Sequence, residues 1–434
     1  MPISVTGGML FVMKRFPLFL TLLLFLFPRL SALSVTGPDI TQPFDSREEL
    51  AQWDFSAPLS DEERSWAQQI DVSIIIMGPT NPVYGWFGHA AIMVRQPGGH
   101  AIMYDYGVFD NTGADFYFNF LRGRMLYSVW ATDGDWRIED EKTLGRYLAE
   151  YKLDFTPEQK VAIFSFLQEN VKEENRTYLY HFYKDNCATR LRDILDEVTG
   201  GDFKSWLERN GEDGTYRSWA EGYMTHSPFI SFVLNFIQGR EIDKPITEYE
   251  RTYLPESLAS AIESYEPFHA EKVLIQEQDE RVGFKETPHP AKDDGLFLLF
   301  GILSALLVWF LSKREHQAWG KLLEFVFLFI LAFLGTLLVW GMCFSDIDVI
   351  WYNEAFLIAN PALFAAGFMI WKHPEKTERM KRFFFWVTIA LTIAKGLFPE
   401  LLIQDDIKTI FVVLPYYFTG FTDGYATQKK DPSL

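Results

Sequence analysis

The chain has 434 residues, two cysteines and a formal net charge of −18. Residues 34–294 hold 46 of the 58 acidic and 25 of the 40 basic side chains, which gives this part of the chain a net charge of −21. Such a charge argues against nucleic acid and against anionic lipid headgroups as binding partners.

The N-terminus has the pattern of a Sec-type signal peptide, which we assign to residues 1–33. A lysine and an arginine follow Met13, and an apolar run covers residues 16–27. Because Arg29 interrupts a poor cleavage site, an uncleaved signal anchor stays open as an alternative. In both cases the following domain, assigned to residues 34–268, is exported.

The exported domain is predicted to be α+β. Its expected elements, in chain order, are a helix after the cap pair Ser60 and Glu63, a strand over 71–78, a hairpin over 87–107 that turns at QPGG, a strand over 122–131, a helix over 156–171, a strand over 177–183, a helix between Asp185 or Asn186 and Gly200, and a mainly helical stretch over 218–268.

The helix over 156–171 has the clearest boundaries. Thr156 and Gln159 form a capping-box pattern around a proline at the first helical position. Val161, Phe164 and Leu167 fall along one side, so we expect these three to pack on the core.

A charged tether, assigned to 269–293, leads to five apolar runs, each near the length that a helix needs to cross about 30 Å of hydrocarbon. Basic segments alternate with acidic ones between the runs, and the positive-inside rule places the basic segments in the cytoplasm. The sequence therefore predicts five transmembrane helices over 294–423 and a cytoplasmic tail over 424–434. The bilayer would be the bacterial inner membrane, with residues 34–293 in the periplasm. The apolar runs are 295–311, 322–344, 355–371, 383–398 and 407–421; the cytoplasmic loops are 312–321 and 372–382.

Lys395 lies inside the fourth apolar run. An ionisable residue within the membrane is a functional candidate by default. Because Lys395 is close to the end of the run, we expect its amine to reach the interface instead.

Cys187 is the one cysteine outside the membrane runs, since Cys343 falls in the second of them. A disulfide between the two is implausible, so Cys187 is a lone thiol in an oxidising compartment. A cap at Asn186 would put Cys187 at the first position of a helix, where backbone N–H groups favour a thiolate and are placed to receive an oxyanion.

A nucleophilic thiol needs an imidazole base and a group that orients it. His89 opens the first strand of the hairpin. With Arg95 opposite His100, His89 falls opposite residue 106, or opposite Asp105 if the turn holds a bulge. We therefore predict Cys187 as nucleophile, His89 as base and Asp105 as orienter, with His100 too far along the hairpin to serve. The residues assigned a supporting role are Asn186, Asp185, Arg190 and Tyr84.

Simpler interpretations of these residues stay open. In one, Cys187 fills core space as a small apolar side chain, and in another, His89 is structural. His181 and Asp185 next to Cys187 suggest a metal site, but no cysteine pair or His-x-x-x-His spacing supports one, so no metal or other cofactor is predicted. Arg190 and Arg192 fit a solvated or salt-bridged helix face.

The order of these residues resembles that of the circularly permuted papain-like thiol enzymes, a group that includes lecithin retinol acyltransferase and permuted NlpC-like hydrolases. In that group the histidine precedes the cysteine, as His89 precedes Cys187 here. The resemblance implies a permuted papain-like fold.

Six blocks in order resemble the Lnb N-terminal periplasmic domain family over about residues 60–268. The family usually has a cysteine before the Gly-Pro that follows its first strand, where this chain has Met77, so a second active-site thiol is not expected. One member of the family looks like a maturation factor for a secreted lacto-N-biosidase. The blocks are MGPTNPVYGWFGHAAIMV, MYDYGVFD, RGRMLYSV, LDFTPEQKVAIFSFLQEN, YHFYKDNCATRLRDIL and YLPESLASAIESY.

Three functions are compatible with these observations. The first is a membrane-anchored thiol hydrolase or acyltransferase that acts outside the cytoplasm on an amide, ester or thioester of a peptide, lipid or acylated protein. The second is a periplasmic chaperone or maturation factor for exported enzymes, without catalysis. The third is a sensor or scaffold. The sequence leaves the substrate and the oligomeric state undetermined.

Overall fold

The computed structural model describes residues 50, 53–81, 83–109, 119, 122–282, 294–312 and 316–422, so the predicted signal peptide and the C-terminal tail lie outside the described residues. The chain forms two compact units. We call Ile40–Ser231 with Ile242–Ala291 the exported unit, and Phe232–Glu241 with Lys292–Leu434 the C-terminal unit; residues Met1–Asp39 are grouped with the latter.

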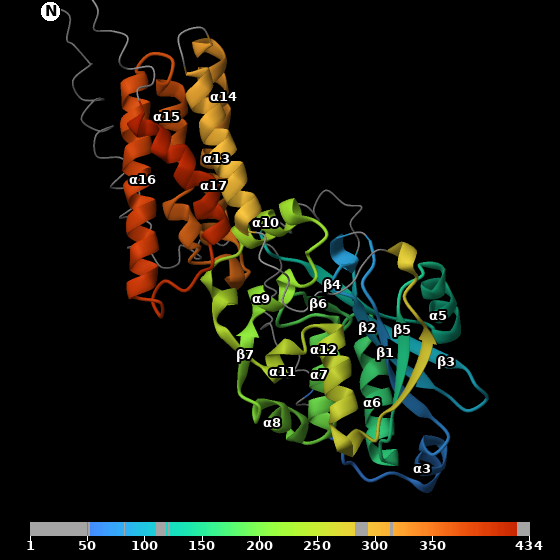
Figure 1. Ribbon diagram of the computed structural model, residues 1–434. Coiled ribbons are helices and arrows are strands. Elements are labelled where there is room, and N and C mark those ends of the chain that lie inside the picture. The colour runs from blue at the N-terminus through green and yellow to red at the C-terminus, as the bar shows by residue number, and fades with distance from the viewer. Residues whose placement is uncertain are drawn as a thin grey trace, which may run out of the picture. The chain divides into compact units, whose positions relative to one another are not determined.

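The exported unit is built on a seven-stranded sheet with the order β6-β4-β3-β2-β1-β5-β9, in which each neighbouring pair of strands is antiparallel. The predicted hairpin forms β2 and β3 near the middle of this sheet (Figure 1). The strands are β1 (Asp71–Met77), β2 (His89–Arg95), β3 (Ala101–Val108), β4 (Leu126–Asp133), β5 (Leu148–Leu153), β6 (Thr177–Leu179) and β9 (Glu271–Gln276); a separate pair is β7 (Glu212–Thr215) with β8 (Pro245–Thr247).

Helices cover both faces of the sheet (Figure 1). One face carries the main core, where Ile92 and Tyr104 pack with helices α6, α7 and α12, and the opposite face packs Met93 and Met103 against Ile138 of α5. This division follows from the alternation of side chains along a strand. The helices are α3 (Asp61–Ala67), α5 (Gly134–Thr143), α6 (Pro157–Asn170), α7 (Cys187–Val198), α8 (Asp202–Glu208), α9 (Tyr216–Glu221), α10 (Pro228–Ile237), α11 (Glu248–Arg251) and α12 (Pro255–Ser264).

Two predicted helix starts are confirmed. Ser60 with Glu63, and Thr156 with Gln159, form reciprocal capping boxes. The predicted core face of α6 is confirmed for Leu167, which is buried, and for Phe164, which is partly buried and packs against the core. Val161 is partly buried, whereas Ile163 and Phe166, which were not predicted, are buried. The buried positions recur at intervals of three and four residues, which is the stripe that an amphipathic helix presents to a core.

Three other expectations for the exported domain need correction. Residues 271–276 were expected to belong to a tether but form β9, which pairs with β5 at the edge of the sheet. Charged side chains on an edge strand resemble a linker in composition. Strand β6 ends at Leu179 rather than 183, and the expected helical stretch over 218–268 contains β8.

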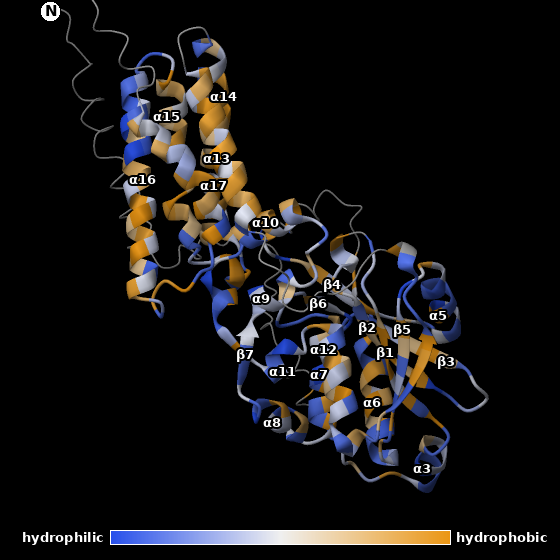
Figure 2. Cartoon of the chain, viewed as in Figure 1, coloured by the Kyte–Doolittle hydropathy of each residue, from blue (hydrophilic) through white to orange (hydrophobic). Residues whose placement is uncertain are grey.

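The C-terminal unit contains five helices within its described residues, and two of them, α13 and α14, are long and apolar enough to cross a membrane. Figure 2 shows both as hydrophobic along most of their length, while the first turns of α16 are hydrophilic. The third predicted span is not a continuous helix, because α15 has seven residues and starts after Pro361. The helices are α13 (Asp294–Leu311), α14 (Gln317–Phe344), α15 (Leu363–Met369), α16 (Pro374–Leu397) and α17 (Ile407–Phe418).

Residues 232–241 belong to the C-terminal unit, although the sequence analysis placed them in the exported domain. The ring of Phe232 stacks on Phe297 at 5.1 Å, and the Nδ2 atom of Asn353 donates to the carbonyl of Phe236 at 2.8 Å. Gly239 lies so close to Trp351 that a Cβ atom would be 2.2 Å from the Trp351 carbonyl oxygen. A contact between distant segments of this kind leaves no periodic signal in the sequence.

Lys395 has acidic partners that the sequence analysis did not predict. Its amine contacts the carboxylate of Glu354, the carbonyl oxygen of Gln404 at 2.7 Å and Oδ1 of Asp406 at 3.4 Å. Lys395 is thus the cation of a largely buried polar cluster, which we call the Lys395 cluster.

Candidate functional site

The three predicted catalytic residues lie together in the exported unit. His89 is the first residue of β2, Asp105 lies in β3, and Cys187 is the first residue of α7. The Nε2 atom of His89 is 2.9 Å from Oδ1 of Asp105. Because a carboxylate can only accept, Nε2 carries the hydrogen, and Nδ1 is left for the hydrogen bond between the imidazole and the Cys187 sulfur.

The register of the hairpin differs from the predicted one. Arg95 pairs with Ala101 rather than His100, so residue 91 falls opposite Asp105 and His89 is its diagonal neighbour. Diagonal neighbours on one face of a sheet are about 7–8 Å apart between backbones, within reach of an imidazole and a carboxylate. His100 is exposed at the far end of the hairpin, as expected.

The start of α7 is fixed by Asn186, as predicted. Its Oδ1 atom accepts from the backbone N–H groups of Ala188 and Thr189, both at 2.9 Å. Its Nδ2 atom donates to the carbonyls of Phe182 at 2.8 Å and Tyr253 at 3.0 Å. Asn186 therefore positions the thiol, but it also occupies two of the amides that were expected to face an oxyanion.

The electrostatics of the site favour a thiolate beside an imidazolium. Burial acts to raise the pKa of Cys187, but the His89 charge and hydrogen bond, with the backbone groups of Ala90 and Ala188, bring that pKa below its usual value. Burial likewise acts to lower the pKa of His89, yet Cys187 and Asp105 raise it to about 9. The two groups stabilise each other's charged forms.

Asp105 is held by a charged network that sequence reasoning missed. Burial acts to raise the pKa of its carboxyl group, but His89 and Arg137 lower it below the usual range. The Nε atom of Arg137 is 3.4 Å from Oδ2 of Asp105, and its Nη1 atom contacts Oε1 of Glu141. The Oε2 atom of Glu141 pairs with Nε of Arg146 at 2.6 Å. The spacing of four between Arg137 and Glu141 in α5 was the only available signal, and it is common on exposed helices.

The supporting residues have separate places. The buried carboxylate of Asp185 forms a two-pronged ion pair with Arg190, with Nε to Oδ1 at 2.5 Å, so both brace the start of α7. Arg192 is also buried and paired with Asp193, so this helix face is salt-bridged rather than solvated. Tyr84 is exposed, and its ring meets Phe109 edge-on.

His181 has a structural role. Its Nδ1 atom accepts from the backbone N–H groups of Tyr183 at 3.2 Å and Lys184 at 3.0 Å, which shapes the turn before α7. Within the described residues, no group of three or more histidine, cysteine or acidic side chains is arranged to hold a metal ion.

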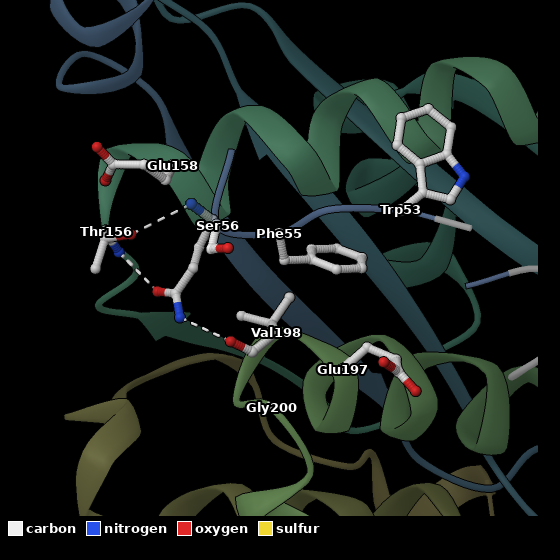
Figure 3. Close-up of a pocket in the computed structure, with 9 residues that line it drawn as sticks. Trp53, Phe55, Ser56, Thr156, Glu158, Glu197, Val198 and Gly200 are labelled. Carbon is white, nitrogen blue, oxygen red and sulfur yellow. Dashed lines mark hydrogen bonds between the residues drawn. The ribbon is translucent and has the colours of Figure 1, made fainter. Parts of the chain in front are cut away.

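A pocket in the exported unit lies away from the thiol (Figure 3). Gln159, which donates to the carbonyl of Val198 at 2.8 Å, forms part of its wall near Trp53 and Phe55. Val198 ends α7, so the pocket is about 16 Å along that helix from Cys187. The pocket therefore contributes nothing to the chemistry of the thiol.

Residues 62–222 match the profile of the Lnb N-terminal periplasmic domain family, a range that includes all three site residues. This range is therefore an Lnb N-terminal periplasmic domain. A search of curated proteins and a search of solved structures gave no significant match. Together with the two long apolar helices, the Lnb N-terminal periplasmic domain indicates a membrane-associated protein with an exported domain.

Met77 occupies the position where the Lnb family usually has a second cysteine. Its side chain is fully buried, and it pairs directly with His89 across β1 and β2.

Proposed function

We propose that the chain is a membrane-anchored thiol hydrolase or acyltransferase that acts outside the cytoplasm on an amide, ester or thioester. The observation that carries this proposal is the order Asp105, His89, Cys187, in which one imidazole is hydrogen-bonded to a carboxylate on one side and to a thiol on the other. That arrangement supplies a nucleophile, a base and an orienter.

The reaction follows from the charges of the site. The Cys187 thiolate attacks the substrate carbonyl carbon, and a tetrahedral intermediate forms. The His89 imidazolium then donates its Nδ1 proton to the leaving amine, alcohol or thiol as the bond to it breaks, which leaves a thioester on Cys187. Water or an acceptor hydroxyl, amine or thiol gives its proton to His89 and attacks the thioester, which frees the product and restores the pair.

Asp105, Arg137 and the first turn of α7 each assist the proposed reaction. Asp105 keeps the proton on Nε2 and stabilises the imidazolium, and Arg137 holds Asp105 as a carboxylate. Because the amides of Ala188 and Thr189 serve the Asn186 cap, the N–H of Cys187 itself is the first-turn donor that would face the oxyanion. The fold that brings histidine before cysteine would be a permuted papain-like one.

The C-terminal unit would anchor the enzyme in the inner membrane. In this proposal its apolar segments cross five times, with 312–321 and 372–382 in the cytoplasm, and the third crossing combines α15 with the residues before it. Support comes from α13 and α14 and from the alternation of basic and acidic loops.

The test uses the full chain in detergent with Cys343→Ala, so that Cys187 is the single thiol. Iodoacetamide labelling of Cys187 is followed against pH, and acyl-enzyme formation from p-nitrophenyl acetate is followed by intact mass. We expect a labelling midpoint below the free-cysteine value of about 8.5 and an acyl adduct that is absent from Cys187→Ser. A midpoint at or above that value together with no adduct would contradict catalysis and leave a non-catalytic maturation role.

A further inference from the structure

A row of five aromatic rings lies beside the thiol. The neighbouring rings meet at centroid distances of 5.8, 4.8, 4.2 and 5.8 Å, which are contact distances for aromatic pairs. We call this row the aromatic ladder; its members, in order, are Tyr84, Phe109, Tyr127, Tyr180 and Phe182.

The ladder is assembled by the tertiary fold. Its rings come from the turn after β1, the end of β3, the strand β4 and the segment after β6. The inner rings Tyr127 and Tyr180 stack on each other and pack against the main core. The end rings are open to solvent, with Tyr84 69% and Phe182 40% exposed.

The inner part of the ladder is next to the nucleophile. Burial raises the pKa of Tyr180 well above its usual value, and the charge of Cys187 raises it further, so the phenol and the thiolate interact. Gly107, two residues before Phe109, has a left-handed φ of 92°, and a Cβ atom there would be 3.9 Å from Cys187 Cβ. The middle of the ladder and Cys187 thus pack against the same core, while the two ends of the ladder reach solvent.

None of the five ladder side chains is charged at neutral pH. Burial raises the pKa of Tyr127 to about 12, so its phenol stays neutral as well. A substrate part that lies along this surface would meet aromatic rings and no charged side chain of the ladder, and one end of it would place a carbonyl group at Cys187.

We infer that the aromatic ladder binds the apolar acyl chain of the substrate whose carbonyl carbon Cys187 attacks. The inference rests on the proposed thiol chemistry and narrows its substrate to long-chain acyl compounds. A sugar ring is the less suitable occupant of the inner rings, because it would need an open aromatic face, whereas Tyr127 and Tyr180 stack on each other. The net charge of −21 also favours an uncharged chain over an anionic headgroup.

The experiment measures how fast alkyl methanethiosulfonates label Cys187 in the full chain with Cys343→Ala. In this reaction the thiolate attacks the divalent sulfur, a disulfide forms, and methanesulfinate leaves, so no turnover is required. Rates for the methyl and hexyl reagents are compared with those of glutathione in the same detergent solution. Because burial of each methylene contributes up to about fourfold, we expect the hexyl preference to exceed that of glutathione by about tenfold or more.

Variants of the ladder test whether its rings cause the preference for the hexyl reagent. Tyr84→Ala and Phe182→Ala should lower the hexyl rate more than the methyl rate, whereas Trp136→Ala, which removes an equally exposed ring from α5, should retain the preference. A hexyl preference equal to that of glutathione, or one unchanged by both ladder variants, would overturn the inference. Protection of Cys187 by tri-N-acetylchitotriose would also overturn it, in favour of a glycan site.

The outcomes separate this inference from the proposed function. A ladder-dependent hexyl preference without any acyl-enzyme would support the apolar chain site and count against the reaction. An acyl-enzyme without a chain-length preference would support the reaction and exclude the ladder as its acyl site.

Discussion

The exported unit and the C-terminal unit each bury a network of charged side chains, but the two networks differ in charge balance. In the exported unit, Asp105 and Glu141 face Arg137 and Arg146, so two anions meet two cations. The His89 and Cys187 pair attached to this network is also balanced when both groups are ionised. Because the charges of these four side chains cancel, they do not oppose the negative charge of a buried thiolate.

The Lys395 cluster has one cation for two carboxylates. Lys395 contacts Glu354 and Asp406, and the outer oxygens of the two acids, Oε1 and Oδ2, have no hydrogen-bond partner among the described residues. Burial raises the pKa of Asp406 to about 6, Lys395 opposes this effect, and Glu354 adds to it. Below about pH 6 a proton on Asp406 relieves the surplus negative charge.

The comparison teaches that buried ion pairs serve different ends in the two units. In the proposed reaction, the charges of the exported unit favour the thiolate of Cys187. Their loss should therefore lower mainly the rate of Cys187 acylation. In the C-terminal unit they connect α16 to the segments around Glu354 and Asp406, so their loss should appear mainly in stability.

The largest effect is expected from His89→Ala. The thiolate loses its imidazolium partner and the leaving group loses its acid, so acylation of Cys187 should fall about 10²- to 10⁴-fold with the fold intact. Stopped-flow measurement of p-nitrophenolate release provides the rates. His100→Ala, at the exposed end of the same hairpin, serves as the control, and an equal loss in both variants would argue against a specific role of His89.

Lys395→Met should lower the free energy of unfolding by about 3–5 kcal/mol, because two buried carboxylates lose their cation. Thermal and denaturant unfolding of the detergent-solubilised chain would measure this change, with Lys372→Met at an exposed position as the control. If Lys395→Met instead left stability unchanged and abolished acylation, the contrast between the two networks would be wrong.

Asp105→Asn tests the balance of the thiol site through its pH profile. Acylation should rise as Cys187 ionises and fall again as the His89 imidazolium deprotonates near pH 9. Because Asp105 helps to raise that pKa, the variant should move the descending limb to lower pH, by on the order of one unit. A descending limb that stays near pH 9 would show that Asp105 does not set the charge of the imidazole.

The smallest effect is expected from Asp406→Asn. The folded-state pKa of Asp406 is raised from 3.8 to about 6, so the folded chain binds more protons between these values and wild-type stability falls as pH rises through this window. The asparagine removes this dependence and should raise stability at pH 7 by on the order of 1 kcal/mol. Unfolding midpoints at pH 4.5 and pH 7 would measure the effect, and a loss of stability at both pH values would contradict it.

Local sequence patterns predicted the starts of three helices and the proximity of His89 to Asp105. Capping residues mark the starts of α3, α6 and α7 because they satisfy backbone donors within the same turn. The hairpin brings His89 and Asp105 onto one face because side chains alternate along a strand, although the one-residue error in register shows that turn geometry was not readable in advance.

Only the tertiary structure decided what surrounds these residues. Four features of the structure depend on how separate elements pack. They are the brace of Arg137, Glu141 and Arg146, the aromatic ladder, the membership of residues 232–241 in the C-terminal unit, and the partners of Lys395. Sequence patterns report spacings within one element, whereas these contacts depend on how separate elements pack. The sequence by itself therefore predicted Cys187, His89 and Asp105 as one site, and the fold determined the charges around them and the aromatic rings beside them.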